Sequence, residues 1–102
     1  MARTPKLENL IDRVREYVDA GRYQLTRHAD RRMKERNVLL PEALHVLKTG
    51  WHEKAKDQYQ KQFDNWKYAI RSQTVDDRSL RVIIAIDDDR DMVIITVVDL
   101  DK

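Results

Sequence analysis

Two apolar segments near the C-terminal end of this 102-residue chain constrain its fold more than any other feature. Residues 80–86 and 92–98 are nearly continuous runs of aliphatic side chains, and an acidic segment, Asp87-Asp-Asp-Arg-Asp91, separates them. Runs of this length and composition are typical of strands in the middle of a sheet. The short polar segment predicts a tight turn between them. The sequence therefore predicts a central β-hairpin against which the rest of the chain packs.

Two further segments before this hairpin have the alternation of strands. In residues 66–73, Trp66, Tyr68, Ile70 and Ser72 alternate with Lys67, Ala69, Arg71 and Gln73. This pattern predicts one buried and one solvent-facing side. Residues 51–57 alternate less clearly and predict another strand, which would place Lys54 and Lys56 on one side. Residues 59–65 predict a polar connection and residues 76–79 a turn.

The first half of the chain predicts three helices. Apolar residues recur every three or four positions from Leu7 to Val18, with Thr4-Pro5 as the expected start and Gly21 as the expected end. Residues 23–26 form a short extended segment, and Thr26 is placed to cap a second helix that ends near Asn37. A third helix is expected from Pro41 to Gly50.

Helices followed by strands predict a single α+β domain over residues 1–102. The expected architecture has N-terminal helices packed on one face of a twisted antiparallel sheet of three to five strands, because the helices must bury their apolar stripes against one sheet face. With 102 residues the chain is long enough for one modest core but too short for two.

Composition excludes several classes of function. The chain has no cysteine, which rules out a disulfide scaffold and a thiolate nucleophile. No apolar run approaches the roughly 20 residues that span a bilayer, and the start of the chain lacks the apolar core of a signal peptide. We therefore expect a cytoplasmic protein without membrane contact.

The charge is distributed unevenly along the chain. Residues 22–36 carry six basic and two acidic side chains, whereas residues 75–102 carry four basic and eight acidic ones. The middle of the chain is thus basic and its end acidic. Residues 37–74 carry six basic and four acidic side chains, so a phosphate-rich partner is expected to bind the region 22–74.

The strongest candidate site lies in the second predicted helix. His28, Arg32 and Arg36 are spaced four apart, so they share one helical face. Histidine transfers protons near neutral pH and arginine binds phosphate, which together suit metal-free RNA cleavage. The alternative is that His28 caps or packs and that the arginines pair with Asp30 and Glu35 on a solvated face. Spacing alone favours this alternative.

A second group of residues has the chemistry to bind RNA. Lys67 and Arg71 fall on the solvent-facing side of their strand and would form a basic floor opposite the second helix, with Lys54 and Lys56 alongside. Tyr59 is expected to be exposed for base stacking. The alternative is an ordinary charged strand face. The histidines lack metal-ligand spacing, so neither a metal nor another cofactor is expected.

Several motifs together resemble a known bacterial family. They are His28-Ala29, Arg32-Met33 and Glu35-Arg36 in one run, Val46-Leu47 followed by Gly50, and Trp66-x-Tyr68. This pattern is similar to domain-of-unknown-function family 4258, which is thought to be related to RelE, MqsR and BrnT-type toxins. The resemblance implies a RelE-like fold, metal-free cleavage of messenger RNA by His28, Arg32 and Arg36, and an antitoxin protein as partner.

These observations leave two main hypotheses. The first is an endoribonuclease toxin in which His28 acts as general base or acid, Arg32 and Arg36 hold the phosphate, and Lys67 and Arg71 guide the RNA. The second is a non-catalytic module that binds nucleic acid or protein through the same basic face. An antitoxin-like regulator is a third possibility, although the chain has neither a separate DNA-reading helix nor a disordered acidic tail.

Overall fold

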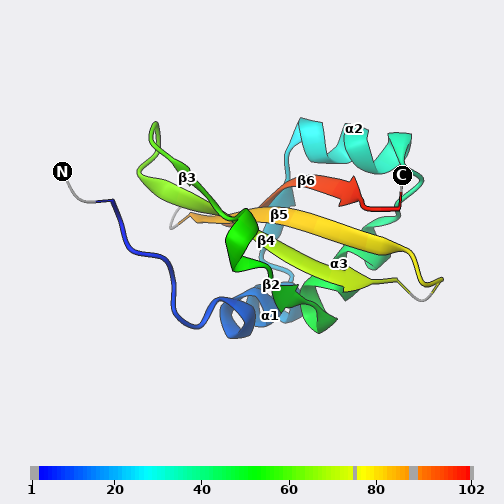
Figure 1. Ribbon diagram of the computed structural model, residues 1–102, viewed down its shortest axis with the longest axis horizontal. Helices are drawn as coiled ribbons and strands as arrows, with labels where there is room; N and C mark the ends of the chain where they lie inside the picture. Colours follow the sequence, from blue (N-terminus) through cyan, green and yellow to red (C-terminus); the bar gives the residue numbers. More distant parts are fainter. Residues whose placement is uncertain (1–2, 75, 88–89, 102) are drawn as a thin grey trace.

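The protein is an α+β domain, as the sequence predicts (Figure 1). The computed structural model describes residues 3–74, 76–87 and 90–101, and within these it has three α-helices, one short 3-10 helix and a six-stranded sheet. The elements in chain order are α1 (Leu10–Ala20), β1 (Tyr23–Leu25), α2 (Arg27–Glu35), α3 (Leu40–Thr49), β2 (Trp51–His52), the 3-10 helix η1 (Lys54–Lys56), β3 (Gln58–Gln60), β4 (Asn65–Gln73), β5 (Ser79–Asp87) and β6 (Asp91–Asp99).

The sheet is built around the β5–β6 hairpin. Its strand order is β1-β6-β5-β4-β2, with β3 also paired to β4, so the predicted central position of the hairpin is confirmed. Residues 88 and 89 of the predicted acidic turn lie outside the described residues. The expectation of a purely antiparallel sheet was wrong, because β1 runs parallel to β6, with Tyr23 opposite Met92. That pairing joins segments far apart in the sequence, which no local pattern specifies.

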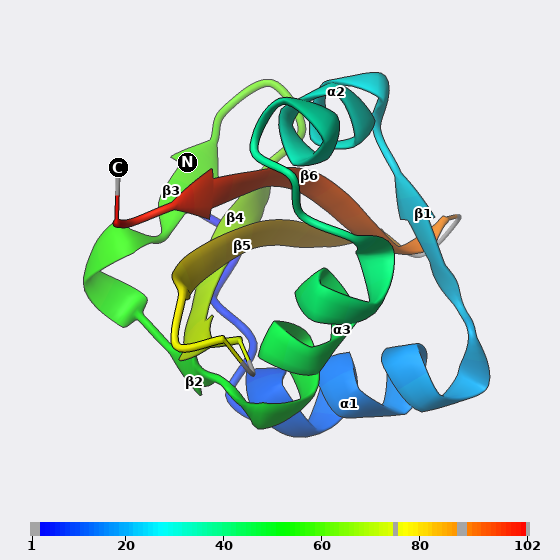
Figure 2. The same cartoon turned by 90° about the vertical axis from the view of Figure 1, so that its right-hand side faces the viewer.

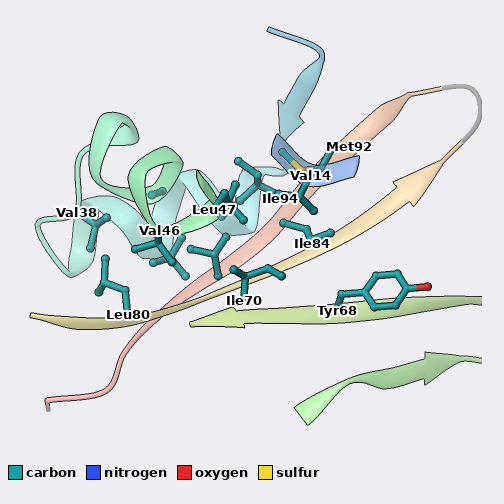
Figure 3. Close-up of a cluster of buried hydrophobic side chains, with 14 of the residues drawn as sticks. Val14, Val38, Val46, Leu47, Tyr68, Ile70, Leu80, Ile84, Met92 and Ile94 are labelled. Atoms are coloured by element: carbon teal, nitrogen blue, oxygen red, sulfur yellow. The ribbon is translucent and has the colours of Figure 1, made fainter. Parts of the chain in front are cut away.

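One face of the sheet forms the core with the three helices (Figure 2). Figure 2 shows α1 and α3 on the same side of the curved sheet, with α2 beside β6. Tyr68 and Ile70 of β4 point into this core, as the predicted alternation requires (Figure 3), whereas Ala69 on the predicted solvent-facing side is fully buried as well. The largest fully buried side chains are Leu10, Val14, Val46, Leu47, Ile70, Leu80, Val82, Ile84, Met92, Ile94 and Val97. The alternate residues of β4 and β5 therefore point away from the helices.

The edge of the sheet beside β4 is interrupted. The predicted strand over residues 51–57 was wrong beyond His52, because the chain leaves β4 as η1 and returns as β3. Part of the predicted polar connection is thus strand. A carboxylate oxygen of Asp57 accepts a hydrogen bond from the Ala69 N–H at 3.0 Å. This side chain replaces the backbone partner that the excursion removes, so the edge stays satisfied.

The helix boundaries follow the predicted caps with one exception. Gly21 ends α1 with a φ of 68°, Thr26 caps α2, and Asn37 has a φ of 54°. Thr4 was wrongly predicted to start the first helix, which begins at Leu10. The segment before it instead docks on β4, where the Trp66 indole N–H donates to the Thr4 carbonyl at 2.7 Å.

We expect Gly50→Ala to destabilise the fold strongly. A Cβ at this position would lie 2.5 Å from the Val46 carbonyl oxygen and 2.7 Å from the Arg71 carbonyl oxygen, where α3 meets β4. The backbone must shift to make room, so urea denaturation should show that the free energy of unfolding falls by roughly 3 kcal/mol. Gly21→Ala is the control, because its Cβ would meet no atom within 4 Å and only the left-handed backbone costs energy, about 1 to 2 kcal/mol. Equal losses in the two variants would contradict close packing at Gly50.

Candidate functional site

Helix α2 is fixed to β6 at its start. The Thr26 hydroxyl accepts a hydrogen bond from the Ala29 N–H at 3.0 Å and donates one to the Ile95 carbonyl at 3.0 Å. Ala29 and Met33 fill the core. These contacts determine which side of α2 is turned to solvent.

The solvent side of α2 is cationic. Arg27, His28 and Arg31 are exposed, and among the described residues none of their side chains has a hydrogen-bond or ion-pair partner. Arg32 is half-buried and borders them, with a salt bridge to Glu35 at 3.0 Å. We call Arg27, His28, Arg31 and Arg32 the α2 cationic face. An imidazole beside three guanidinium groups can offer both proton transfer and anion binding.

The predicted ladder of His28, Arg32 and Arg36 is not available as a unit. Arg36 turns to β6, where its guanidinium donates to the Val97 carbonyl at 2.6 Å. Strand β1 pairs with residues 92–94 of β6. Beyond them the backbone carbonyls on this edge of β6 have no strand partner and need another hydrogen-bond donor. The pairing of Arg32 with Glu35 is the alternative that the sequence left open, whereas Asp30 pairs with Lys34.

The residues predicted to bind RNA do not form one surface. Lys67 and Arg71 point from the sheet face opposite the core, and α2 packs on the core side, so the expected basic floor does not lie opposite α2. Tyr59 is paired with Trp66 and shares its face of β4. Its ring is half-buried rather than exposed, with the Arg3 guanidinium 4.9 Å from its centroid.

Lys54 and Lys56 are exposed in η1 and lie on no strand. The sequence pattern placed them beside Lys67 on the assumption that residues 51–57 are extended. Since the 3-10 turn replaces that strand, the strand alternation no longer decides where their side chains point.

A carboxylate between two arginines lies on the outer face of the sheet, and the sequence analysis missed it. Glu53 is 8 % exposed and accepts from Arg81 at 2.5 Å and from Arg71 at 3.4 Å. The hydrogen bond from Arg81 lowers the pKa of Glu53. Trp51, Arg71 and Arg81 stand opposite one another on β2, β4 and β5. The strand alternation of residues 80–86 could have indicated that Arg81 points away from the core, on the face where Arg71 lies.

A second ionic cluster surrounds a buried carboxylate and was also missed. The Asp57 carboxylate contacts the His52 imidazole at 2.7 Å and the Lys6 ammonium at 3.0 Å, and its side chain is fully buried. The His52 ring packs edge-on against Tyr68. This cluster ties the N-terminal segment to the edge of the sheet, which is a structural role.

Two open pockets lie away from the α2 cationic face. One of about 730 Å³ is lined by His45, Thr49, Trp51, Arg71, Ser72, Gln73, Thr74 and Ser79. Another of about 690 Å³ is lined by Met33, Lys34, Asn37, Val38, Leu39, Glu42, Asp76 and Arg78. Neither lining includes Arg27, His28, Arg31 or Arg32, so the α2 cationic face is not part of these pockets.

Metal and membrane features are absent from the part of the chain that the structure describes. In residues 3–74, 76–87 and 90–101, no group of three or more histidine or carboxylate side chains is placed to hold a metal ion. No helix in these ranges is long and apolar enough to cross a membrane.

The fold and surfaces define a small α+β domain with a mixed sheet, a cationic helix and an arginine-rich outer sheet face. Residues 25–99 match the family described as Domain of unknown function (DUF4258). The chain therefore belongs to this family, which confirms that part of the resemblance. No curated protein matches the sequence.

Thr26→Ala should loosen α2 from β6. It removes both the cap of the Ala29 N–H and the hydrogen bond to the Ile95 carbonyl. The expected loss of unfolding free energy is about 1 to 2 kcal/mol, measured by chemical denaturation. Thr26→Ser keeps the hydroxyl and should retain most of the stability. A serine variant as unstable as the alanine variant would show that the hydroxyl does not anchor the helix.

Glu53 should make stability depend on pH in the acid range. Its pKa in the folded protein lies below the ordinary value of 4.5, so the unfolded chain binds the proton first. The stabilisation is complete above about pH 4.5 and is lost as the pH falls through the folded-state pKa. The stability difference between wild type and Glu53→Gln should therefore shrink between pH 6 and pH 3, as followed by urea denaturation at each pH.

The exposed Glu16 of α1 supplies the control for this measurement. The difference in unfolding free energy between wild type and Glu16→Gln should stay nearly constant from pH 6 to pH 3. A constant difference for Glu53→Gln as well would show that the contacts with Arg71 and Arg81 do not depend on its charge.

Proposed function

We propose that this protein is the toxin of a bacterial toxin–antitoxin pair and acts as a metal-independent endoribonuclease in the cytoplasm. The observation that carries the proposal is His28, an exposed imidazole without a partner among the described residues, next to the guanidinium groups of the α2 cationic face. The chain's membership of the DUF4258 family, with its expected relationship to RelE, MqsR and BrnT-type toxins, supports the same activity. The partners are then RNA and an antitoxin protein.

The chemistry needs only RNA, this face and water. The 2′-hydroxyl oxygen attacks the adjacent phosphorus, its proton leaves, and the bond to the 5′-oxygen breaks, giving a 2′,3′-cyclic phosphate and a 5′-hydroxyl. His28 takes the first proton or gives one to the departing 5′-oxygen, and water performs the other transfer. Arg32 and its neighbours stabilise the charge that grows on the phosphate oxygens.

The contacts of α2 change which arginines bind phosphate in this proposal. Arg36 is bound to the Val97 carbonyl and positions the helix. Arg27 and Arg31 are exposed and take over the contact with phosphate that the sequence assigned to Arg36. Lys67 and Arg71 lie on the other side of the sheet, so they bind RNA away from the cleaved bond.

A second candidate function is a non-catalytic module that binds RNA or a protein. It is favoured by the engagement of Arg32 with Glu35, which leaves less free positive charge beside His28. In this case RNA binding weakens with salt, because neutralised phosphates release counterions, and no strand is cut.

His28→Ala separates the two functions. Wild-type protein should cleave single-stranded RNA in the presence of a chelator, and the variant should be slower by about 100-fold or more, as expected for a lost proton-transfer group. Cleavage is followed on labelled RNA at one protein concentration and ionic strength.

Lys34→Ala is the matched control, because Lys34 is an exposed cation on the same helix. It should cleave at nearly the wild-type rate. Wild-type protein that binds RNA without cutting it would exclude the nuclease and favour the binding module.

A further inference from the structure

Trp51 is an exposed aromatic residue in a polar surrounding. Its side chain is 55 % exposed and lies outside the core cluster. In the sheet Trp51 is directly opposite Arg71, so the indole and the guanidinium emerge side by side from the outer face. Both line the pocket of about 730 Å³, a volume within the range of small-ligand sites.

Glu53 positions the Arg71 side chain but leaves part of its guanidinium open to a further partner. Its guanidinium contacts Glu53 at 3.4 Å, and the stronger contact of Glu53 is with Arg81 at 2.5 Å. The Arg71 side chain remains 40 % exposed. A guanidinium has five N–H donors, so Arg71 can still bind an anion in the pocket. Because the side chain is already positioned, less conformational entropy is lost on binding.

The same pocket is also lined by residues of α3, which packs on the core face, so the pocket extends from the outer face to the core side past the end of β2. His45 is exposed there, and the Thr49 hydroxyl accepts from or donates to the Ser72 hydroxyl at 3.2 Å. Among the described residues lining this pocket, Arg71 is the one with a fixed charge. The nearby Asp101 carboxylate accepts the Ser79 N–H at 2.8 Å, which ties it to the backbone.

We propose that this pocket binds one nucleotide of single-stranded RNA, with its base stacked on Trp51 and its phosphate held by Arg71 and His45. A flat aromatic surface beside a fixed guanidinium matches a base joined to a phosphate. The inference rests on the proposed function for the choice of RNA, and it adds a binding site apart from the α2 cationic face.

Binding is tested with the whole protein and a five-nucleotide RNA that carries 2′-O-methyl groups. This ligand cannot undergo attack by the 2′-hydroxyl, so the result is independent of nuclease activity. Affinity is measured by calorimetry at constant ionic strength. Trp51→Ala should weaken binding by roughly 5- to 150-fold, the range for loss of one base stack. Arg71→Gln should also weaken it.

Two substitutions serve as matched controls. Phe63 is 67 % exposed and lies between β3 and β4, and Arg90 is exposed between β5 and β6, so both are outside the pocket lining. Phe63→Ala and Arg90→Gln should leave the affinity unchanged. Circular dichroism checks that all four variants are folded.

Three results would overturn the site. One is equal affinity of Trp51→Ala and Phe63→Ala for the RNA. Another is equally tight binding of an abasic ligand with the same backbone, which would show charge attraction alone. The third is competition by an acidic peptide as effective as competition by the RNA, which would make the pocket a site for a protein partner.

Discussion

Burial of one face of the sheet is the constraint on which the rest of the structure depends. Tyr68, Ile70, Val82 and Ile84 enter the core with the helices. Because side chains alternate along a strand, the residues between them have to point outward. Arg71 and Arg81 therefore stand on the outer face, one strand apart. Their mutual repulsion is offset by Glu53, which supplies the opposite charge from outside these two strands.

The edge of the sheet is interrupted directly after Glu53. The Glu53 N–H donates to the Ala69 carbonyl at 2.8 Å, after which the chain leaves β4 and Asp57 completes the hydrogen bonding of Ala69. The same carboxylate binds His52 and Lys6, so the N-terminal segment depends on the same turn.

Helix α2 and the outer sheet face offer two separate surfaces for an anionic partner. The first is presented by a helix that Thr26 and Arg36 bind to β6. The second is presented by strands and includes the pocket beside Trp51. In the proposals made above, a longer single-stranded RNA contacts both surfaces, and the proposed cleavage at the first is separable from the proposed binding at the second.

The sequence by itself determined the three helices, the central hairpin and the alternation of β4, because these depend on local periodicity and on caps such as Thr26 and Gly21. It also placed His28 beside arginines on one helical face, but spacing alone favoured a capping or packing role, and only the structure shows that His28 is exposed. Only the tertiary structure decided that Arg36 donates a hydrogen bond to the edge of β6 and that Glu53 forms salt bridges with both Arg71 and Arg81. These partners lie far apart in the chain, and a guanidinium binds whichever acceptor the packing brings within reach.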